Sequence, residues 1–188
     1  MSLLKRKSLT FDLLAIAYIE AMTRRAFDPG QCPVGRTLER VGDTWSLMIL
    51  RDALQGVSRF DQFQKSLGVA PNILTQRLAA LVEAGFLERR PYQERPLRHE
   101  YLVTNLARDF APVLTALMAF GNRHYAVEGI ASQMVEAATG VAAEPVVVDR
   151  RTRKPIDGPD FIYAAGPAAG PVVLERVAQV ARGRQARS

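Results

Sequence analysis

The sequence predicts a mainly α-helical fold that contains one small β-hairpin. Apolar residues recur at helical spacing in successive segments between residues 33 and 125. Proline, glycine and short polar residues mark where these segments begin and end. Two strand-forming runs around a short connection lie between the last two of these segments. A single hairpin among consecutive helices indicates a small, mostly helical domain.

Composition narrows the class of protein. The chain has 188 residues, of which 48% are hydrophobic and 23% are charged, as is typical of one globular domain with an extension. The net charge of +6 favours polyanionic partners, although a basic surface can also simply be solvated. The single cysteine cannot form an intrachain disulfide, which suits a cytoplasmic protein.

The first 26 residues, "MSLLKRKSLTFDLLAIAYIEAM…", join a basic start to an apolar run. Asp12 and Glu20 interrupt this run, and it is too short to span a bilayer. We therefore expect an amphipathic helix that packs on a partner or on the rest of the chain, and no membrane association. A signal peptide is the alternative.

Two helices are expected next. Pro33 opens a short helix that ends near Val41. In "GDTWSLMILRDALQG", Asp43 or Thr44 is the candidate N-cap and Gly56 the stop signal. This second segment is apolar on most sides, so we expect a central, largely buried helix.

A tight helical pair follows. "SRFDQFQKSLG" has Ser58 as a candidate N-cap and ends at Gly68. Three residues later Pro71 suits the first turn of another helix, which we expect to end near Ala84. Two short helices joined by so short a connection form a helix-turn-helix unit.

The second helix of this unit has two distinct faces. Four apolar residues share one face: Leu74, Leu78, Leu81 and Val82. The opposite face and its flanks carry short or polar residues: Asn72, Thr75, Gln76, Arg77, Ala79, Ala80 and Glu83. Amides can donate to and accept from base edges, and a threonine hydroxyl can bond a base or a phosphate. An ordinary amphipathic helix is the alternative.

Residues 86–92 and 98–104 are predicted strands, with Pro91 and Pro96 limiting them to edge-like pairing. The candidate phosphate or minor-groove contacts on this hairpin, and just before the helical pair, are basic: Arg59, Arg89, Arg90, Arg95, Arg98 and His99. Three glutamates are interleaved, so a neutralised, solvated hairpin is the alternative. Helix, turn, helix and hairpin in this order form a winged helix-turn-helix, and the combination predicts nucleic-acid binding.

After Thr104, a candidate N-cap, a long helical pattern continues to about Gly129 and contains Pro112, which can bend it. A small winged domain has little core left to cover its apolar stripe. We therefore predict a homodimer formed by the N- and C-terminal helices. The predicted interface residues are Leu13, Leu14, Ile16, Phe110, Leu114 and Leu117. Packing on the C-terminal extension is the alternative.

Beyond Gly140 the chain becomes rich in proline and glycine. Two apolar runs, Val146–Val148 and Phe161–Tyr163, predict a small hairpin, and a terminal helix is expected from about Val172. The run "RRTRK" at residues 150–154 either contacts DNA or forms a solvated turn.

These expectations divide the chain into four parts. They are an N-terminal dimerisation helix (1–26), a winged helix-turn-helix DNA-binding domain (27–104), a helical dimerisation segment (105–139) and the Pro/Gly-rich extension (140–188).

Three segments, "CPVGRTLERVGDTWSLMILRDALQG", "SRFDQFQKSLGVAPNILTQRLAALVEAGFLERR" and "PLRHEYLVTNLARDFAPVL", resemble the HxlR-type winged helix-turn-helix transcriptional regulators. The resemblance covers residues 27–125. It implies a bacterial or archaeal homodimer that binds operator DNA and represses or activates nearby genes. It places the recognition helix at residues 71–84, with contacts from Asn72, Thr75, Gln76 and Arg77, and from Arg95 and Arg98 on the wing.

The sequence departs from the family pattern at two places. Ala70 stands where relatives usually have a serine, which removes a side-chain cap worth about 1 kcal/mol. The region after Gly140 is longer than the family module. We expect the recognition helix either to fray or to take its cap from DNA.

Cys32 is a candidate redox switch, because the resemblance implies a reactive cysteine at this point in some relatives. It directly precedes Pro33 and a helix start, with Arg36 one turn on, a setting that lowers a thiol pKa. The alternative is an unreactive, small apolar residue near the dimer interface. An electrophile or a small ligand is the expected effector.

Two other classes of function were weighed. An enzyme is not expected, because the sequence has no Gly-rich phosphate loop, no nucleophile elbow and no paired metal-ligand motif, and His99 and His124 lie in different predicted elements. We accordingly expect no cofactor and no metal. The remaining alternative is a winged-helix module that binds protein or RNA without operator specificity. A DNA-binding regulator would be associated with the nucleoid.

Overall fold

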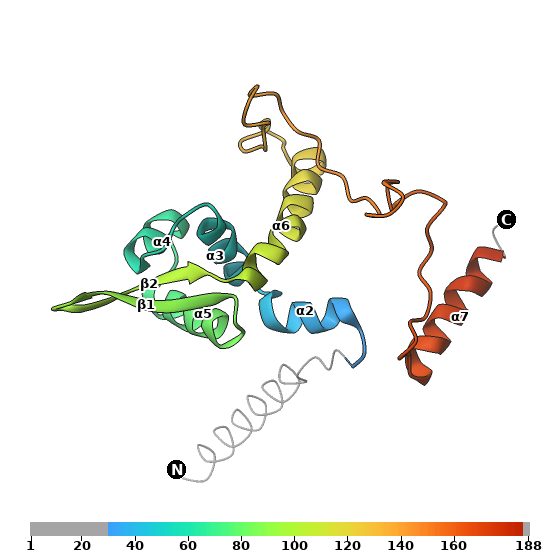
Figure 1. Cartoon of the computed structure of the whole chain (residues 1–188), viewed down its shortest axis with the longest axis horizontal. Helices are drawn as coiled ribbons and strands as arrows, with labels where there is room; N and C mark the ends of the chain where they lie inside the picture. Colours follow the sequence, from blue (N-terminus) through green and yellow to red (C-terminus); the bar gives the residue numbers. More distant parts are fainter. Residues whose placement is uncertain (1–29, 186–188) are drawn as a thin grey trace, which may run out of the picture. The chain divides into compact units, whose positions relative to one another are not determined.

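The computed structural model of the chain describes residues 30–185 (Figure 1). The chain divides into two compact units, residues 1–39 and residues 40–188. The described elements are α2 (Pro33–Val41), α3 (Thr44–Leu54), α4 (Phe60–Leu67), α5 (Pro71–Glu83), β1 (Leu87–Glu94), β2 (Leu97–Val103), α6 (Asn105–His124) and α7 (Pro171–Gln185). The predicted order of helices and wing hairpin is confirmed between residues 33 and 124, whereas the predicted N-terminal helix lies outside the described residues.

The ends of α3 and α4 follow from local hydrogen bonds. Asp43 is the N-cap of α3, and its carboxylate accepts from the Ser46 N–H at 3.1 Å. The expected cap at Ser58 is wrong, because α4 begins one residue later, after Arg59. The carbonyl of Ser58 accepts from the Tyr101 N–H of β2 at 2.7 Å, which keeps the chain extended up to that point.

The connection between α4 and α5 is as short as the sequence predicts. Gly68 ends α4 in the left-handed region, at φ 62°, a conformation that glycine adopts without steric cost. Pro71 is the first residue of α5, and Ala70 precedes it as an N-cap without a side-chain hydrogen bond. The structure therefore contains the predicted helix-turn-helix unit, and α5 lacks a side-chain N-cap as predicted.

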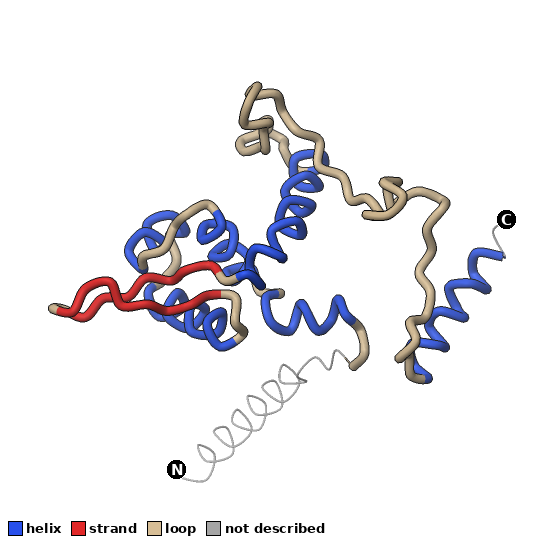
Figure 2. Tube along the Cα trace, viewed as in Figure 1, coloured by secondary structure: helices blue, strands red, loops and turns tan. Residues whose placement is uncertain are grey.

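The hairpin is an antiparallel pair that runs from Leu87 opposite Val103 to Glu94 opposite Leu97 (Figure 2). The strands extend further toward the turn than expected, so that only Arg95 and Pro96 connect them. The register shifts between Pro91 and Gln93, as is common where proline removes a ladder hydrogen bond. α4 contacts β2 and α5 contacts β1, so the hairpin is fixed to the helix-turn-helix unit.

One hydrophobic core joins the helices to the base of the hairpin. Its fully buried members include Ile49 and Leu50 of α3, Phe63 of α4 and Leu78 of α5. The Thr104 hydroxyl donates to the Gly85 carbonyl at 2.7 Å and accepts from the Ala107 N–H at 3.4 Å. This confirms Thr104 as the N-cap of α6 and ties the start of that helix to the end of α5.

Helix α6 is partly core and partly surface. Phe110 packs edge-on against Phe86 with 5.8 Å between ring centroids and is 8% exposed. Further along, large apolar side chains are exposed: Val113, Leu117 and Phe120. The helix ends at His124, before the expected Gly129, because the chain turns there and the Asn122 amide donates to the Ser132 carbonyl at 2.8 Å. Between residues 30 and 185 no helix has both the length and the apolar character needed to cross a bilayer.

The predicted hairpin of Val146–Val148 with Phe161–Tyr163 is wrong. Val148 instead pairs with Pro155 in a single bridge, and residues 161–163 lie outside any strand. A second single bridge joins Val135 to Ala142. Each bridge closes only a few residues, which costs less chain entropy than the longer loop that we expected. The terminal helix is confirmed as α7.

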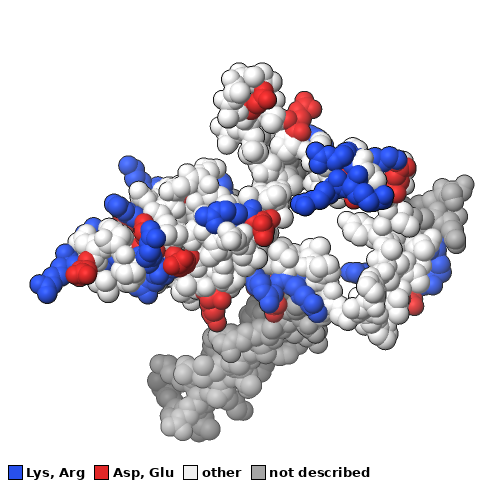
Figure 3. Space-filling model, viewed as in Figure 1, with Lys and Arg blue, Asp and Glu red and all other residues white. Residues whose placement is uncertain are grey.

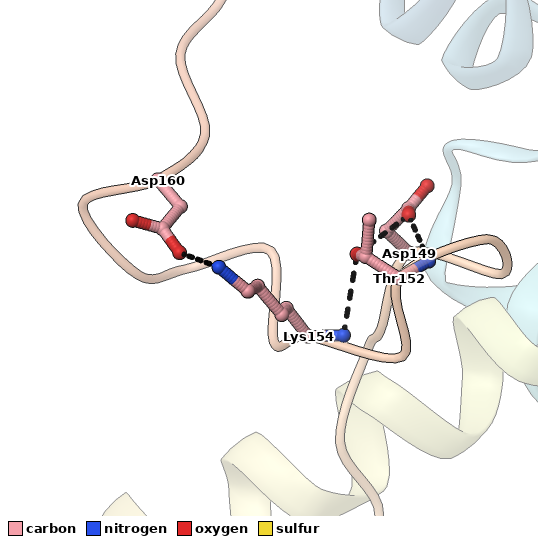
Figure 4. A network of polar contacts seen from close by, with 4 residues as sticks. All are labelled: Asp149, Thr152, Lys154 and Asp160. Atoms are coloured by element: carbon pink, nitrogen blue, oxygen red, sulfur yellow. Dashed lines mark hydrogen bonds and ion pairs between the residues drawn. The ribbon is translucent and has the colours of Figure 1, made fainter.

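The turn that follows Val148 is organised by Asp149 (Figure 4). The Thr152 hydroxyl and N–H each donate to the same carboxylate oxygen of Asp149 at 2.7 Å. These bonds, the hydroxyl first, lower the pKa of Asp149 from its ordinary value of 3.8. The stabilisation of the folded state that these bonds supply is therefore fully present at a pH above 3.8, and it is lost as the pH falls through the lowered pKa of Asp149.

Leu78→Ala tests the core. Leu78 is fully buried, so we expect the free energy of unfolding to fall by about 2–5 kcal/mol. Leu97 is 63% exposed, and Leu97→Ala should change it by less than about 0.5 kcal/mol. Urea denaturation followed by circular dichroism measures both. Equal effects would contradict the assignment of α5 to the core.

Thr152→Val tests the Asp149 turn. Removing the hydroxyl removes the first cause of the lowered pKa, so the Asp149 pKa should rise toward 3.8. Carboxyl-detected NMR titration measures it directly. Thr139→Val removes a hydroxyl that bonds Glu136 in another turn, and it should leave the Asp149 pKa unchanged.

Candidate nucleic-acid interface

Helix α5 presents the two faces that the sequence predicts. Leu74, Leu78 and Leu81 are fully buried. The exposed residues are Asn72, Thr75, Gln76, Ala79 and Glu83, whereas Ala80 and Val82 are half-buried at the edges of the two faces. The outer face is thus short and polar in its first two turns, where a helix in a groove meets base edges.

The polar groups on this face differ in their availability. Within residues 30–185, the side-chain amides of Asn72 and Gln76 have no hydrogen-bond partner. The Thr75 hydroxyl donates to the Pro71 carbonyl at 2.8 Å, which leaves its oxygen lone pairs as acceptors. The exposed surface of α5 therefore offers the amides of Asn72 and Gln76, each with donor and acceptor groups, and the Thr75 oxygen as an acceptor.

Arg77 lies at the contact between α5 and α3. Its Nε atom is 3.2 Å from the Asp43 carboxylate, but the geometry is that of an ion pair without a hydrogen bond. Asp43 therefore serves both helices, as the N-cap of α3 and as the charge partner of α5. The ion pair with Asp43 holds Arg77, a predicted DNA contact, at the junction with α3. Arg77 therefore does not share the outer face with Gln76.

Several basic residues near the stem of the hairpin are engaged within the protein. The Arg90 guanidinium donates to the Glu100 carboxylate at 2.7 and 3.0 Å. Arg89 lies 3.0 Å from the His99 ring nitrogen Nδ1. The Arg59 guanidinium lies over the Tyr92 ring, 4.5 Å from its centroid. The Arg90–Glu100 pair neutralises part of the charge of the stem, and the guanidinium groups of Arg89 and Arg59 are engaged by neighbouring rings.

The tip of the hairpin differs from the stem. Arg95 and Arg98 are exposed, and in the described part of the chain their side chains make no hydrogen bond and no ion pair. Figure 3 shows basic side chains gathered at the far end of the hairpin. The Gln93 amide donates to the Arg95 carbonyl at 3.0 Å and so holds the turn that carries them. The wing therefore concentrates available positive charge at its tip.

Sequence reasoning missed the roles of Leu97 and Tyr92. Leu97 is a large apolar side chain exposed at the tip between the two arginines. Tyr92 and Leu97 help to line a cavity of about 420 Å³ between the wing and the start of α4, together with Phe60 and Arg98. The alternation of side chains between the two faces of a strand could have identified these residues. That signal requires the full strand bounds, which extend further toward the turn than the sequence predicts.

Cys32 is half-buried and immediately precedes α2. Its Sγ atom accepts from the Gly35 N–H at 3.4 Å, so one of the N–H groups in the first turn of α2 contacts the sulfur. The Arg36 guanidinium donates to the Gly30 carbonyl at 2.9 Å. Cys32 thus lies at the start of a helix as predicted, and its redox role stays a prediction.

The predicted dimer residues have different environments. Leu13, Leu14 and Ile16 lie outside the described residues. Phe110 fills the core of its own chain, and Leu114 is half-buried against it. Leu117 is 51% exposed. Of the three predicted interface residues that the structure describes, Leu117 has the most exposed side chain.

Residues 30–185 contain no group of three or more His, Cys, Asp or Glu side chains placed to hold a metal ion. His99 contacts Arg89 on the wing. The His124 ring contacts the Phe120 ring at the end of α6 in a tilted arrangement, with 4.6 Å between ring centroids. Each histidine has an ordinary structural contact.

The fold is that of winged-helix transcription regulators. One solved structure, a proposed transcription factor of Pseudomonas aeruginosa (PA1374), is 48% identical, with a TM-score of 0.57 over 77% of this chain and 99% of that one. A second, the proposed transcription factor PA1607, is 35% identical, with a TM-score of 0.65 over 72% of this chain and 95% of that one.

Residues 40–128 match the HxlR-like helix-turn-helix family. The chain belongs to this family. The uncharacterised HTH-type transcriptional regulator Mb3122 of Mycobacterium bovis is 45% identical over 91 residues, which are 48% of this chain and 58% of the relative. The chain therefore spans little more than half the length of that curated relative.

Proposed function

We propose that this protein is a sequence-specific DNA-binding transcriptional regulator that acts as a homodimer on an inverted-repeat operator. The observation that carries the proposal is the outer face of α5, where Asn72 and Gln76 expose amides without partners. A solvated helix ordinarily carries long charged side chains there. Membership of a helix-turn-helix family whose relatives are named transcriptional regulators supports the same function.

The helix and the wing have separate roles in this proposal. α5 enters the major groove, where the Gln76 amide can bond N6 and N7 of an adenine and the threonine can bond a base or a phosphate. Arg95 and Arg98 contact phosphates or the minor groove, which positions the protein. Base discrimination therefore comes from α5, and most of the sequence-independent affinity comes from the wing.

The second copy is proposed from the exposed part of α6. Leu117 and Phe120 are each about half exposed, and burying such side chains against a partner is favourable. A two-fold dimer would place two α5 helices about one DNA turn apart, which requires an inverted repeat. Neither a catalytic step nor a cofactor is part of this proposal.

We further propose that Cys32 senses oxidants or electrophiles. It is the single cysteine of the chain, and its sulfur lies at the start of α2. An oxidant would remove two electrons and two protons to join Cys32 to a second Cys32 or to a small thiol. The new bond would reposition the helices that engage the two half-sites.

Gln76→Ala separates base recognition from general affinity. We expect it to weaken binding to the best operator by about 1–3 kcal/mol and to change binding to random duplex little. Arg95→Ala and Arg98→Ala should weaken both and lower the salt slope by roughly 0.9 per lost phosphate contact. Fluorescence anisotropy over a salt series measures these changes, with Arg108→Ala on α6 as the control. Equal effects of all variants on both duplexes would refute the assigned roles.

Selection from random duplexes at near-physiological salt tests the function itself. We expect enrichment of an inverted repeat with half-sites about ten base pairs apart. A protein that enriches no sequence would instead be a winged-helix module that binds protein or RNA, and capture of partners would follow.

Cys32→Ser tests the thiol. Diamide and a quinone should change the operator affinity of the parent protein and leave that of the variant unchanged, because the chain has no other cysteine. The same anisotropy assay measures both proteins before and after treatment. An identical response of parent and variant would exclude the thiol mechanism.

A further inference from the structure

The extension contains a structured turn at residues 148–155, which we call the basic turn. Val148 pairs with Pro155, and the Asp149 N–H donates to the Lys154 carbonyl at 2.9 Å. The Arg153 N–H donates back to the Asp149 carbonyl at 2.8 Å. Arg153 itself lies in the left-handed region at φ 60°, which a non-glycine residue adopts rarely. The backbone of this basic run is therefore held in a defined conformation.

Charge is not balanced within the basic turn. Arg150, Arg151 and Arg153 are all exposed, and in the range 30–185 none of their guanidinium groups forms a hydrogen bond or an ion pair. Two carboxylates at or near the turn bond other groups. Asp149 accepts from Thr152, and Asp160 pairs with Lys154. Figure 4 shows the contacts of Asp149 with Thr152 and of Lys154 with Asp160. Three guanidinium groups thus remain available on one short turn.

The wing stem provides a comparison, because an arginine there is neutralised by a carboxylate. There, Arg90 is paired with Glu100 across the strands. In the basic turn, Asp149 accepts from Thr152 and Lys154 pairs with Asp160, so no carboxylate of the described residues is bonded to its exposed arginines. A solvated turn would not need this arrangement, because a paired or less basic sequence could close the same backbone.

We propose that the basic turn is a second contact with double-stranded DNA, separate from the winged helix-turn-helix and directed at backbone phosphates. This inference rests on the proposed DNA-binding function. Guanidinium groups bind phosphate oxygens bidentately. A turn that is already closed loses less conformational entropy on binding than a flexible tail. Contacts to phosphate carry no sequence information, so this surface adds affinity without changing the operator.

The composition of the turn favours duplex DNA over two other polyanions. Single-stranded RNA is usually bound by aromatic side chains that stack on bases, and residues 148–155 contain no aromatic residue. Membrane surfaces are bound by amphipathic helices whose apolar face enters the lipid. Residues 149–154 are all polar and form a turn. Rows of phosphates on a rigid duplex fit three exposed arginines best.

The test is the full-length triple variant Arg150→Gln, Arg151→Gln and Arg153→Gln, measured on random and operator duplexes over a salt series. Three phosphate contacts should lower the salt slope by roughly 2 to 3 and the affinity by about tenfold or more, equally on both duplexes. The matched control is Arg108→Gln, Arg123→Gln and Arg182→Gln, which removes the same net charge from α6 and α7. It should change the slope by less than about one third as much.

Thr152→Val provides a second, charge-neutral variant. It keeps every arginine but removes the hydroxyl that holds Asp149, so it should lower DNA affinity by a smaller factor than the triple variant. Equal salt slopes for the triple variant and its control, in a protein that still selects an operator, would overturn the basic-turn inference alone. Loss of binding to RNA or to anionic vesicles but not to DNA would also overturn it. A parent protein that binds no duplex would overturn the proposed function and this inference together.

Discussion

Burial of one row of leucines on α5 determines what the rest of the molecule can do. Leu74, Leu78 and Leu81 are completely removed from solvent against the same core that holds α3 and the base of the wing. Each buried leucine stabilises the fold by about 1.5–3 kcal/mol relative to an exposed one. Rotating α5 by a fraction of a turn would expose part of this row. The leucines therefore fix which side chains of α5 face outward. Asn72 and Gln76 are among these outward-facing side chains.

Electrostatic pairing decides which basic side chains can meet a partner. On the wing stem, cross-strand contacts occupy Arg89 and Arg90, and Asp43 holds Arg77 next to α3. Exposed ion pairs such as Arg90–Glu100 contribute little to stability, but they reduce the charge presented to a polyanion. Among the residues that the structure describes, the arginines of the wing tip and of the basic turn make no side-chain hydrogen bond and no ion pair. The net charge of the chain is thus less informative than its distribution among pairs.

Local signals made much of the fold predictable. Asp43 and Thr104 act as N-caps, Gly68 ends α4 in the left-handed region, and Pro71 opens α5, because each residue type satisfies or permits a specific backbone geometry. Helical spacing of the leucines also predicted the two faces of α5. The predictions that were wrong depend on contacts between distant segments or on competition between alternative turns. The start of α4 shifted because Ser58 pairs with β2, and the extension closed short turns instead of the longer hairpin.

The amino-acid sequence by itself determined the order of elements, the inward face of α5 and the polar character of its outer face, because these depend on residues a few positions apart. Only the tertiary structure decided which candidate residues are available. It paired Arg77 with Asp43 and Arg90 with Glu100, it buried Phe110 against Phe86, and it left the arginines of the wing tip and the basic turn unpaired. Such pairings join residues that are distant in the chain. They form because packing of the core brings those segments together, which no local pattern specifies.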